Sequence, residues 1–186
     1  MRVITGIARG KRLKTLEGLD VRPTSDKVKE AIFSIIQFDL PSASVLDLFS
    51  GCGQLGIEAL SRGAEHCVFV DKSRQSVAVI RENVQSCGFV SQSRILNMDA
   101  IDYLRSAKSG IDIALLDPPY EQGLILKALP LLEPKLSDRA IVVCEHESDL
   151  ELPDKIGRLK KHREYNYGKK IALTTFITES EDDENE

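Results

Sequence analysis

The chain has 186 residues, of which 42% are hydrophobic, and it carries a formal net charge of −4 at pH 7. This length suits one domain with a sizeable core. No apolar run approaches the length of a membrane span, and residues 1–4 lead straight into basic residues, so we exclude a membrane protein and a secreted protein and expect a cytoplasmic monomer.

The first 40 residues are predicted to form an extension that precedes the core. Residues 2–5 and 12–16 are expected to be two short strands of a hairpin, with glycine-spaced residues between them. Thr24 or Ser25 can cap a helix that continues to about residue 38, because apolar residues then recur at helical spacing.

Strands and helices alternate through the core, which we place at residues 41–178. The strands are expected at 44–49, 66–71, 93–98, 111–116 and 140–145, with helices near 54–62, 74–87, 99–107 and 122–133. This alternation predicts an α/β fold, a doubly wound and mostly parallel sheet with helices on both faces. Residues 157–165 and 171–178 are predicted to close one edge of the sheet as an antiparallel hairpin.

Three glycines follow the first core strand in the pattern Gly51-x-Gly53-x-x-Gly56 and open a helix. Glycine allows a sharp turn and a close ligand, and the start of a helix offers backbone N–H groups without intrahelical partners. The pattern predicts a nucleotide-type cofactor site, with Asp71 at the end of the next strand placed to accept two ribose hydroxyls. A structural glycine turn is the plain alternative, and a dinucleotide such as NAD also fits the pattern.

Asp47 favours S-adenosylmethionine over NAD, because an acid just before the turn would hold an ammonium group and repel a diphosphate. Asp99 follows the third strand, where it is placed to accept a hydrogen bond from an adenine amine; a helix N-cap is its structural alternative. The predicted cofactor-binding residues are Asp47, Phe49, Gly51, Gly53, Asp71, Lys72, Asp99 and Ala100.

Asp117-Pro118-Pro119-Tyr120 follows an almost continuously aliphatic strand, so it should face the cofactor at the carboxyl edge of the sheet. The Asp117 carboxylate and the Pro118 carbonyl can accept from a nucleobase amine and direct its lone pair toward a methyl donor. The two prolines fix φ, and Tyr120 offers a face for stacking. We therefore predict these four residues as catalytic, against the alternative of a Pro-Pro turn that only ends a strand.

Basic residues gather in two clusters of the kind that neutralises phosphates without reading sequence. The N-terminal cluster is Arg9, Lys11, Arg12 and Lys14, and it is predicted to bind substrate. The C-terminal cluster comprises Lys155, Arg158, Lys160, Lys161, Arg163, Lys169 and Lys170. Either cluster can instead be a solvated charged face. Residues 179–186 hold six acids, so the rest of the chain carries about +2; we predict this tail to be disordered and set apart from the fold.

No metal site is predicted. The four cysteines have no C-x-x-C spacing, and with only three histidines they make a poor ligand set, so we interpret them as reduced thiols.

The sequence resembles the RsmD-type guanine-N2 methyltransferases of bacterial small-subunit rRNA over residues 2–178. The resemblance rests on Arg2-Val3-Ile4-x-Gly6-x-x-x-Gly10-x-x-Leu13, on the block from Arg22-Pro23-Thr24 to Phe33, on the segment from Leu46 to Ala64 and on Asp117-Pro118-Pro119-Tyr120. It implies a seven-stranded class I methyltransferase sheet of order 3-2-1-4-5-7-6. It also suggests that Arg22 and Thr24 bind substrate, with helix capping and surface pairing as alternatives. Cys52 and Gln54 stand where the family more often has Ser and Ala.

The motifs predict transfer of a methyl group from S-adenosylmethionine to a nucleobase amine, and the resemblance implies that this amine is the N2 of a guanine in 16S rRNA. We expect the RNA to be met within an assembling ribosomal particle that presents the target base, because the chain has few recognition elements. Adenine-N6 methylation of DNA or RNA is the alternative within the same class. A non-catalytic nucleotide-binding module and an NAD oxidoreductase are the alternatives from other classes.

Overall fold

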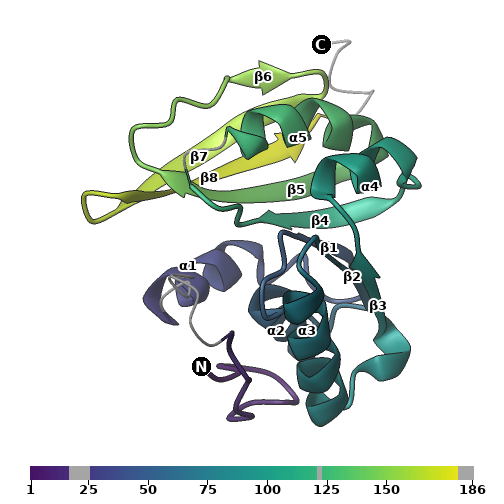
Figure 1. The fold of residues 1–186 in the computed structure, drawn as a ribbon. Helices are drawn as coiled ribbons and strands as arrows, with labels where there is room; N and C mark the ends of the chain where they lie inside the picture. The colour runs from purple at the N-terminus through teal and green to yellow at the C-terminus, as the bar shows by residue number, and fades with distance from the viewer. Residues whose placement is uncertain (17–25, 121–122, 180–186) are drawn as a thin grey trace.

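A computed structural model describes residues 1–16, 26–120 and 123–179, and these residues form one mixed sheet flanked by helices (Figure 1). The strands are β1 (Ser44–Leu48), β2 (His66–Asp71), β3 (Ser93–Asn97), β4 (Ile111–Leu116), β5 (Leu136–Glu147), β6 (Lys155–Ile156), β7 (Leu159–Tyr167) and β8 (Ile171–Thr178). The α-helices are α1 (Asp26–Ile36), α2 (Gln54–Ser61), α3 (Arg74–Cys87), α4 (Ala100–Ser106) and α5 (Leu124–Leu132). Short 3₁₀ turns occupy Val90–Gln92 and Glu133–Lys135.

The strand order is β3-β2-β1-β4-β5-β8-β7-β6, with β1 to β5 parallel and the last three strands antiparallel. This confirms the predicted fold class. The expected order 3-2-1-4-5-7-6 differs in one detail, because the two residues of β6 add a strand at the edge. The observed β7 and β8 correspond to strands 6 and 7 of the expected order. Gly157, at φ +56°, makes the turn that pairs Ile156 with Leu159. Two residues are too few to produce a periodic sequence signal.

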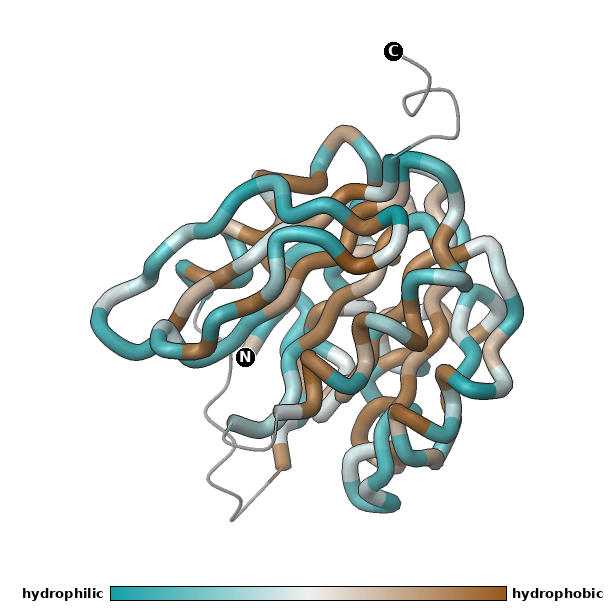
Figure 2. The backbone as a smooth tube through the Cα atoms, turned by 90° about the horizontal axis from the view of Figure 1, so that it is seen from above, coloured by the Kyte–Doolittle hydropathy of each residue, from teal (hydrophilic) through white to brown (hydrophobic). Residues whose placement is uncertain are grey.

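Each face of the sheet is covered by its own apolar cluster. Phe33, Ile57 and Ile80 pack on one face from α1, α2 and α3, whereas Leu104 and Leu129 pack on the other from α4 and α5. Figure 1 shows these two helical layers below and above the sheet, and Figure 2 shows the hydrophobic stretches inside a largely hydrophilic outline. In the part of the chain that the structure describes, no helix is both long and apolar enough to span a membrane.

The predicted N-terminal hairpin forms only one isolated antiparallel bridge, between Arg2 and Arg12, and the strands expected at 2–5 and 12–16 do not form. Around this bridge the Val3 amide donates to the Lys11 carbonyl at 2.9 Å and the Leu13 amide donates to the Met1 carbonyl at 3.1 Å. The reason is competition for backbone donors. The amide of Thr5, the next one after Val3 that would face the partner segment, donates instead to the buried Glu58 carboxylate at 2.9 Å, so the pairing does not extend; the Ile4 amide donates to the same carboxylate at 2.8 Å. The amide of Ala8 likewise donates to Ser61 Oγ on α2 at 3.0 Å.

The helix that follows is confirmed as α1, which ends at Ile36 rather than near residue 38. Its expected cap at Thr24 or Ser25 lies outside the described residues.

Candidate active site

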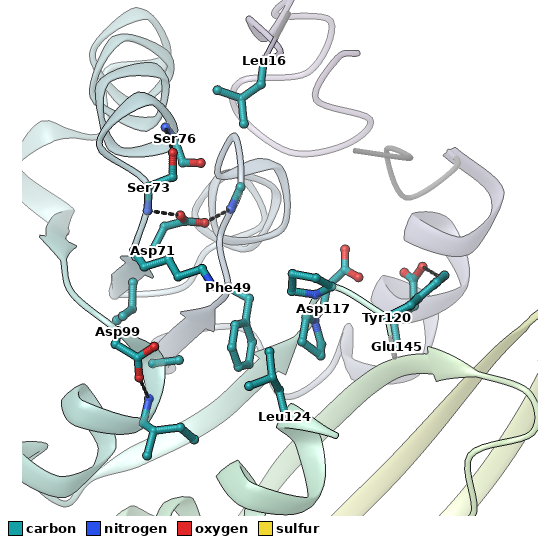
Figure 3. Close-up of a pocket in the computed structure, with 17 residues that line it drawn as sticks. Leu16, Phe49, Asp71, Ser73, Ser76, Asp99, Asp117, Tyr120, Leu124 and Glu145 are labelled. Carbon is teal, nitrogen blue, oxygen red and sulfur yellow. Dashed lines mark hydrogen bonds between the residues drawn. The ribbon is translucent and has the colours of Figure 1, made fainter. Parts of the chain in front are cut away.

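A cavity of about 630 Å³ lies at the carboxyl edge of the parallel strands (Figure 3). Side chains that follow β1, β2, β3 and β4 converge on it, as expected for an open α/β sheet. The predicted residues that line it are Phe49, Gly51, Asp71, Lys72, Asp99, Ala100, Asp117, Pro118, Pro119 and Tyr120. Asp47 and Gly53 are not among the described lining residues, and both are buried.

The glycine turn meets three separate constraints. Gly51 and Gly53 have φ of +56° and +79°, and Gly53 begins α2 in the left-handed conformation. A Cβ on Gly56 would lie 2.3 Å from the ring of Phe69 in β2, so any side chain there would push α2 off the sheet. The spacing therefore builds both the turn and the close packing of helix on strand.

Phe49 has a positive φ of +69°, which is unfavourable for a bulky side chain. The conformation is held by the amides of Phe49 and Ser50, which both donate to the Val70 carbonyl at 3.1 Å. It places the ring of Phe49 in the cavity wall. Local backbone strain of this kind clusters at functional sites.

Asp47 is 2% exposed, and its carboxyl accepts a hydrogen bond from the Gly56 amide at 2.9 Å. Burial raises the pKa of Asp47 to about 8, and the nearby charges of Asp117 and Asp71 raise it further, against the lowering effect of the Gly56 amide. The Asp47 carboxyl therefore stabilises the glycine turn through its hydrogen bond with the Gly56 amide. Its pairing with an ammonium group remains a prediction.

Asp71 joins two loops that border the cavity. One carboxylate oxygen accepts from the Gly51 amide at 2.9 Å and the other accepts from the Ser73 amide at 2.8 Å (Figure 3). Each carboxylate oxygen has two lone pairs, so the same group can also accept from two ligand hydroxyls. This geometry suits the predicted contact with a ribose.

Asp99 is the N-cap of α4, because its Oδ1 accepts from the amides of Ile101 and Asp102 at 2.8 and 3.4 Å. The capping alternative is therefore confirmed. Asp99 also lines the cavity, so the adenine contact is compatible with the cap and remains a prediction.

Asp117, Pro118, Pro119 and Tyr120 all line the cavity, and Asp117 and Tyr120 lie in the opposite part of it from Asp71 and Asp99 (Figure 3). The Tyr120 hydroxyl donates to Glu145 Oε1 at 3.3 Å. Lys72 is the only cationic side chain among the described lining residues, which also include four carboxylates, those of Asp71, Asp99, Asp117 and Glu145. An acidic cavity of this kind attracts a cationic ligand and repels a diphosphate.

The N-terminal basic cluster lies outside the cavity, and all four of its side chains are exposed. The Asn83 side chain connects it to the glycine turn by accepting from the Lys14 amide at 2.8 Å and donating to the Lys14 and Cys52 carbonyls at 3.0 and 2.9 Å. The Lys14 ammonium pairs with Glu82. Arg22 and Thr24, also predicted to bind substrate, lie outside the described residues.

The C-terminal basic cluster is largely paired with acids of the same chain. Lys155 and Lys160 contact Glu179 at 2.7 and 3.4 Å, and these lysines lower the pKa of Glu179, which is the first residue of the predicted acidic tail. Arg158 pairs with Glu133 at 3.1 Å and Asp138 at 2.9 Å, and Lys161 pairs with Asp154 at 3.3 Å. This pairing favours the charged-face interpretation of this cluster. The rest of the tail, residues 180–186, lies beyond the described part of the chain.

Sequence reasoning missed several lining residues, among them Leu16, Ser73, Ser76, Leu124 and Glu145. One signal was available for Glu145, namely its place at the end of a predicted parallel strand. Since Leu116 of β4 pairs with Cys144 of β5, Asp117 and Glu145 follow at the same edge. The four cysteines are free thiols, and burial raises the pKa of each.

The chain is similar to known proteins over nearly its whole length. A family described as "Conserved hypothetical protein 95" matches residues 1–176. YlbH of Bacillus subtilis (strain 168), named as a candidate rRNA methyltransferase, is 38% identical over 173 residues, which are 90% of this chain and 94% of YlbH. Ribosomal RNA small subunit methyltransferase D of Escherichia coli (strain K12) is 31% identical over 166 residues, 88% of this chain and 83% of that protein.

Solved structures give the same result. The yhhF protein of Escherichia coli superposes with a TM-score of 0.87 at 31% identity and covers 97% of this chain and 99% of its own. An RNA methyltransferase of Salinibacter ruber, solved with S-adenosyl-L-homocysteine, superposes with a TM-score of 0.65 at 20% identity and covers 86% of this chain and 95% of its own. These likenesses confirm the class I methyltransferase fold that the sequence resemblance implied.

Proposed function

We propose, from the premise that this chain belongs to the RsmD-type methyltransferase family, that it methylates the exocyclic N2 amine of a guanine in small-subunit rRNA with S-adenosylmethionine. The names of the relatives support the more general part of this proposal, which is methylation of rRNA. We further propose a cytoplasmic monomer that acts on an assembling particle, with residues 1–40 as an extension of the 41–178 core and 179–186 as an acidic tail whose first residue, Glu179, is held by Lys155 and Lys160.

The observation that carries the proposal is an acidic cavity with Asp71 and Asp99 in one part and Asp117-Pro118-Pro119-Tyr120 in the other. S-adenosylmethionine fits the first part, because it is a cation with two ribose hydroxyls for Asp71 and an adenine amine for Asp99. When bound, it supplies an activated methyl group. NAD fits less well, since its diphosphate would face carboxylates.

The residues of the second part perform the positioning chemistry. The lone pair of a guanine N2 amine is delocalised into the ring, so the amine is a poor nucleophile. The Asp117 carboxylate and the Pro118 carbonyl accept its two hydrogens and direct the lone pair at the methyl group, while Tyr120 stacks on the base. Asp117 or water then accepts the proton that the methylated amine releases.

Product analysis tests the function. The protein is incubated with S-adenosylmethionine and naked rRNA, partly assembled particles or intact small subunits, and the nucleosides are analysed by mass spectrometry. We expect N2-methylguanosine, with the highest yield from one of the particle forms. N6-methyladenosine as the product would establish the alternative within the class. Calorimetry with S-adenosylmethionine and NAD decides the cofactor independently.

Replacing Asp71 with alanine should weaken S-adenosylmethionine binding by about 1 to 3 kcal/mol, because the variant cannot accept hydrogen bonds from the ribose. Calorimetry measures this change. Asp102→Ala is a matched control, since this exposed acid pairs with Arg105 at 3.0 Å and is not among the described lining residues. Unchanged affinity in Asp71→Ala would remove the ribose assignment.

Replacing Lys11, Arg12 and Lys14 together with alanine should weaken RNA binding and flatten its salt dependence. The slope of the logarithm of the binding constant against the logarithm of the salt concentration should become less steep by roughly 0.7 to 0.9 for each phosphate that is no longer neutralised. S-adenosylmethionine affinity should not change, because these side chains lie outside the cavity. The matched control is the alanine triple of Lys155, Lys160 and Lys161, which already pair with acids. Filter binding at several salt concentrations compares the two, and a larger effect in the control would move the RNA surface to the C-terminal cluster.

A further inference from the structure

We propose that Glu145 is the residue that selects guanine, by accepting a hydrogen bond from the N1–H of the target base while Asp117 accepts from the adjacent N2 amine. This inference rests on the proposed function, and it gives a specificity role to a residue that the tetrapeptide Asp117-Pro118-Pro119-Tyr120 does not contain.

The sheet places Glu145 beside the tetrapeptide. Leu116 of β4 and Cys144 of β5 are paired neighbours, so Asp117, directly after β4, and Glu145, within β5, lie at the same level on adjacent parallel strands, which are about 4.8 Å apart. Glu145 is 4% exposed, lines the cavity, and accepts from the Tyr120 hydroxyl at 3.3 Å. In Figure 3, Glu145 and Tyr120 lie on the far side of Asp117 from Asp71 and Asp99, which is the part of the cavity assigned to the base.

The chemistry of this second carboxylate distinguishes the two purines. Asp117 and the Pro118 carbonyl can accept from the exocyclic amine of either base, so they do not by themselves choose between guanine and adenine. Guanine presents the N1–H donor next to its N2 amine, whereas adenine presents the N1 lone pair next to its N6 amine. A carboxylate oxygen accepts a hydrogen bond from the N1–H of the first edge but meets a lone pair at the N1 of the second, so Glu145 as a carboxylate favours guanine.

The test compares guanine with 2-aminopurine, which keeps the 2-amine but has an N1 acceptor in place of N1–H. The methylated position is first mapped on the RNA product of the wild-type enzyme. The same RNA is then prepared with either base at that position, and kcat/KM for methyl transfer is measured for the wild type and for Glu145→Gln. The glutamine can donate to the N1 of 2-aminopurine, so we expect the preference of the wild type for guanine over 2-aminopurine to fall roughly ten- to a hundredfold.

Two controls separate direct contact from a structural role. Tyr120→Phe removes the hydroxyl that contacts Glu145, and it should keep the guanine preference whatever its rate. Glu147→Gln makes the same substitution two residues along β5, at a side chain outside the lining, and should also keep the preference. S-adenosylmethionine binding by calorimetry checks that each variant is folded.

The possible outcomes are distinct. A guanine preference that stays intact in Glu145→Gln would overturn the inference while leaving the proposed function in place. Loss of the guanine preference in Tyr120→Phe would also overturn it, because Glu145 would then act only by supporting the tyrosine. A wild-type product methylated on adenine would instead overturn the proposed function itself, and the inference with it.

Discussion

Replacing Asp117 with alanine is expected to abolish methyl transfer, with a loss of roughly a thousandfold or more, while S-adenosylmethionine affinity changes by no more than a few fold. In the proposed mechanism the carboxylate acts on the base amine, and an acceptor aligned at a reacting group contributes mainly in the transition state. The charge of Asp117 raises the pKa of Asp47, which is a predicted cofactor-binding residue. A small change in S-adenosylmethionine affinity in Asp117→Ala is therefore consistent with this role. Single-turnover methyl transfer and calorimetry measure the two quantities separately.

A matched control for this variant is Asp112→Ala. Asp112 lies near the amino end of the same strand, β4, at the other end from Asp117, and its carboxylate accepts from the Ser44 amide at 2.9 Å. It should keep full rate in folded protein. Parallel loss of cofactor binding and catalysis in Asp117→Ala would instead make Asp117 a cofactor residue.

Replacing Asp47 with asparagine is expected to stabilise the protein at alkaline pH relative to the wild type. The carboxyl keeps its proton up to about pH 8 when folded but loses it near pH 3.8 when unfolded. The folded state therefore binds more protons in this window, and the contribution of Asp47 to stability falls as pH rises from about 4 to 8. Asparagine has no proton to lose, and its amide oxygen can still accept from Gly56. The advantage of the variant should grow across this window to several kcal/mol, at about 1.4 kcal/mol per pKa unit, and then level off.

Urea denaturation at a series of pH values between 4 and 9 measures this difference. Asp39→Asn, at an exposed site after α1, is the control and should leave the pH dependence unchanged. An advantage of Asp47→Asn that stays constant from pH 4 to 8 would show that Asp47 ionises normally in the folded protein, and would remove the argument that its burial opposes the charged form.

Local patterns were enough to predict the core of this protein. The alternation of apolar strands and amphipathic helices, together with the glycines from Gly51 to Gly56, predicted the parallel sheet and the helix that starts at the cavity. The strand before Asp117 placed the tetrapeptide at the same edge. Each of these features depends on residues within one short window, where side-chain periodicity and permitted φ values decide the conformation.

Long-range contacts decided the rest. Glu58, which is 53 residues beyond Thr5, takes an amide that a longer hairpin would have used. Glu179 and Lys155, which are 24 residues apart, meet and neutralise part of a basic cluster that looked available in the sequence. The site itself shows the same division: the sequence determined Asp117 and its neighbours, but only the pairing of β4 with β5 brought Glu145 beside them, because the choice of partner strand depends on the packing of the whole sheet.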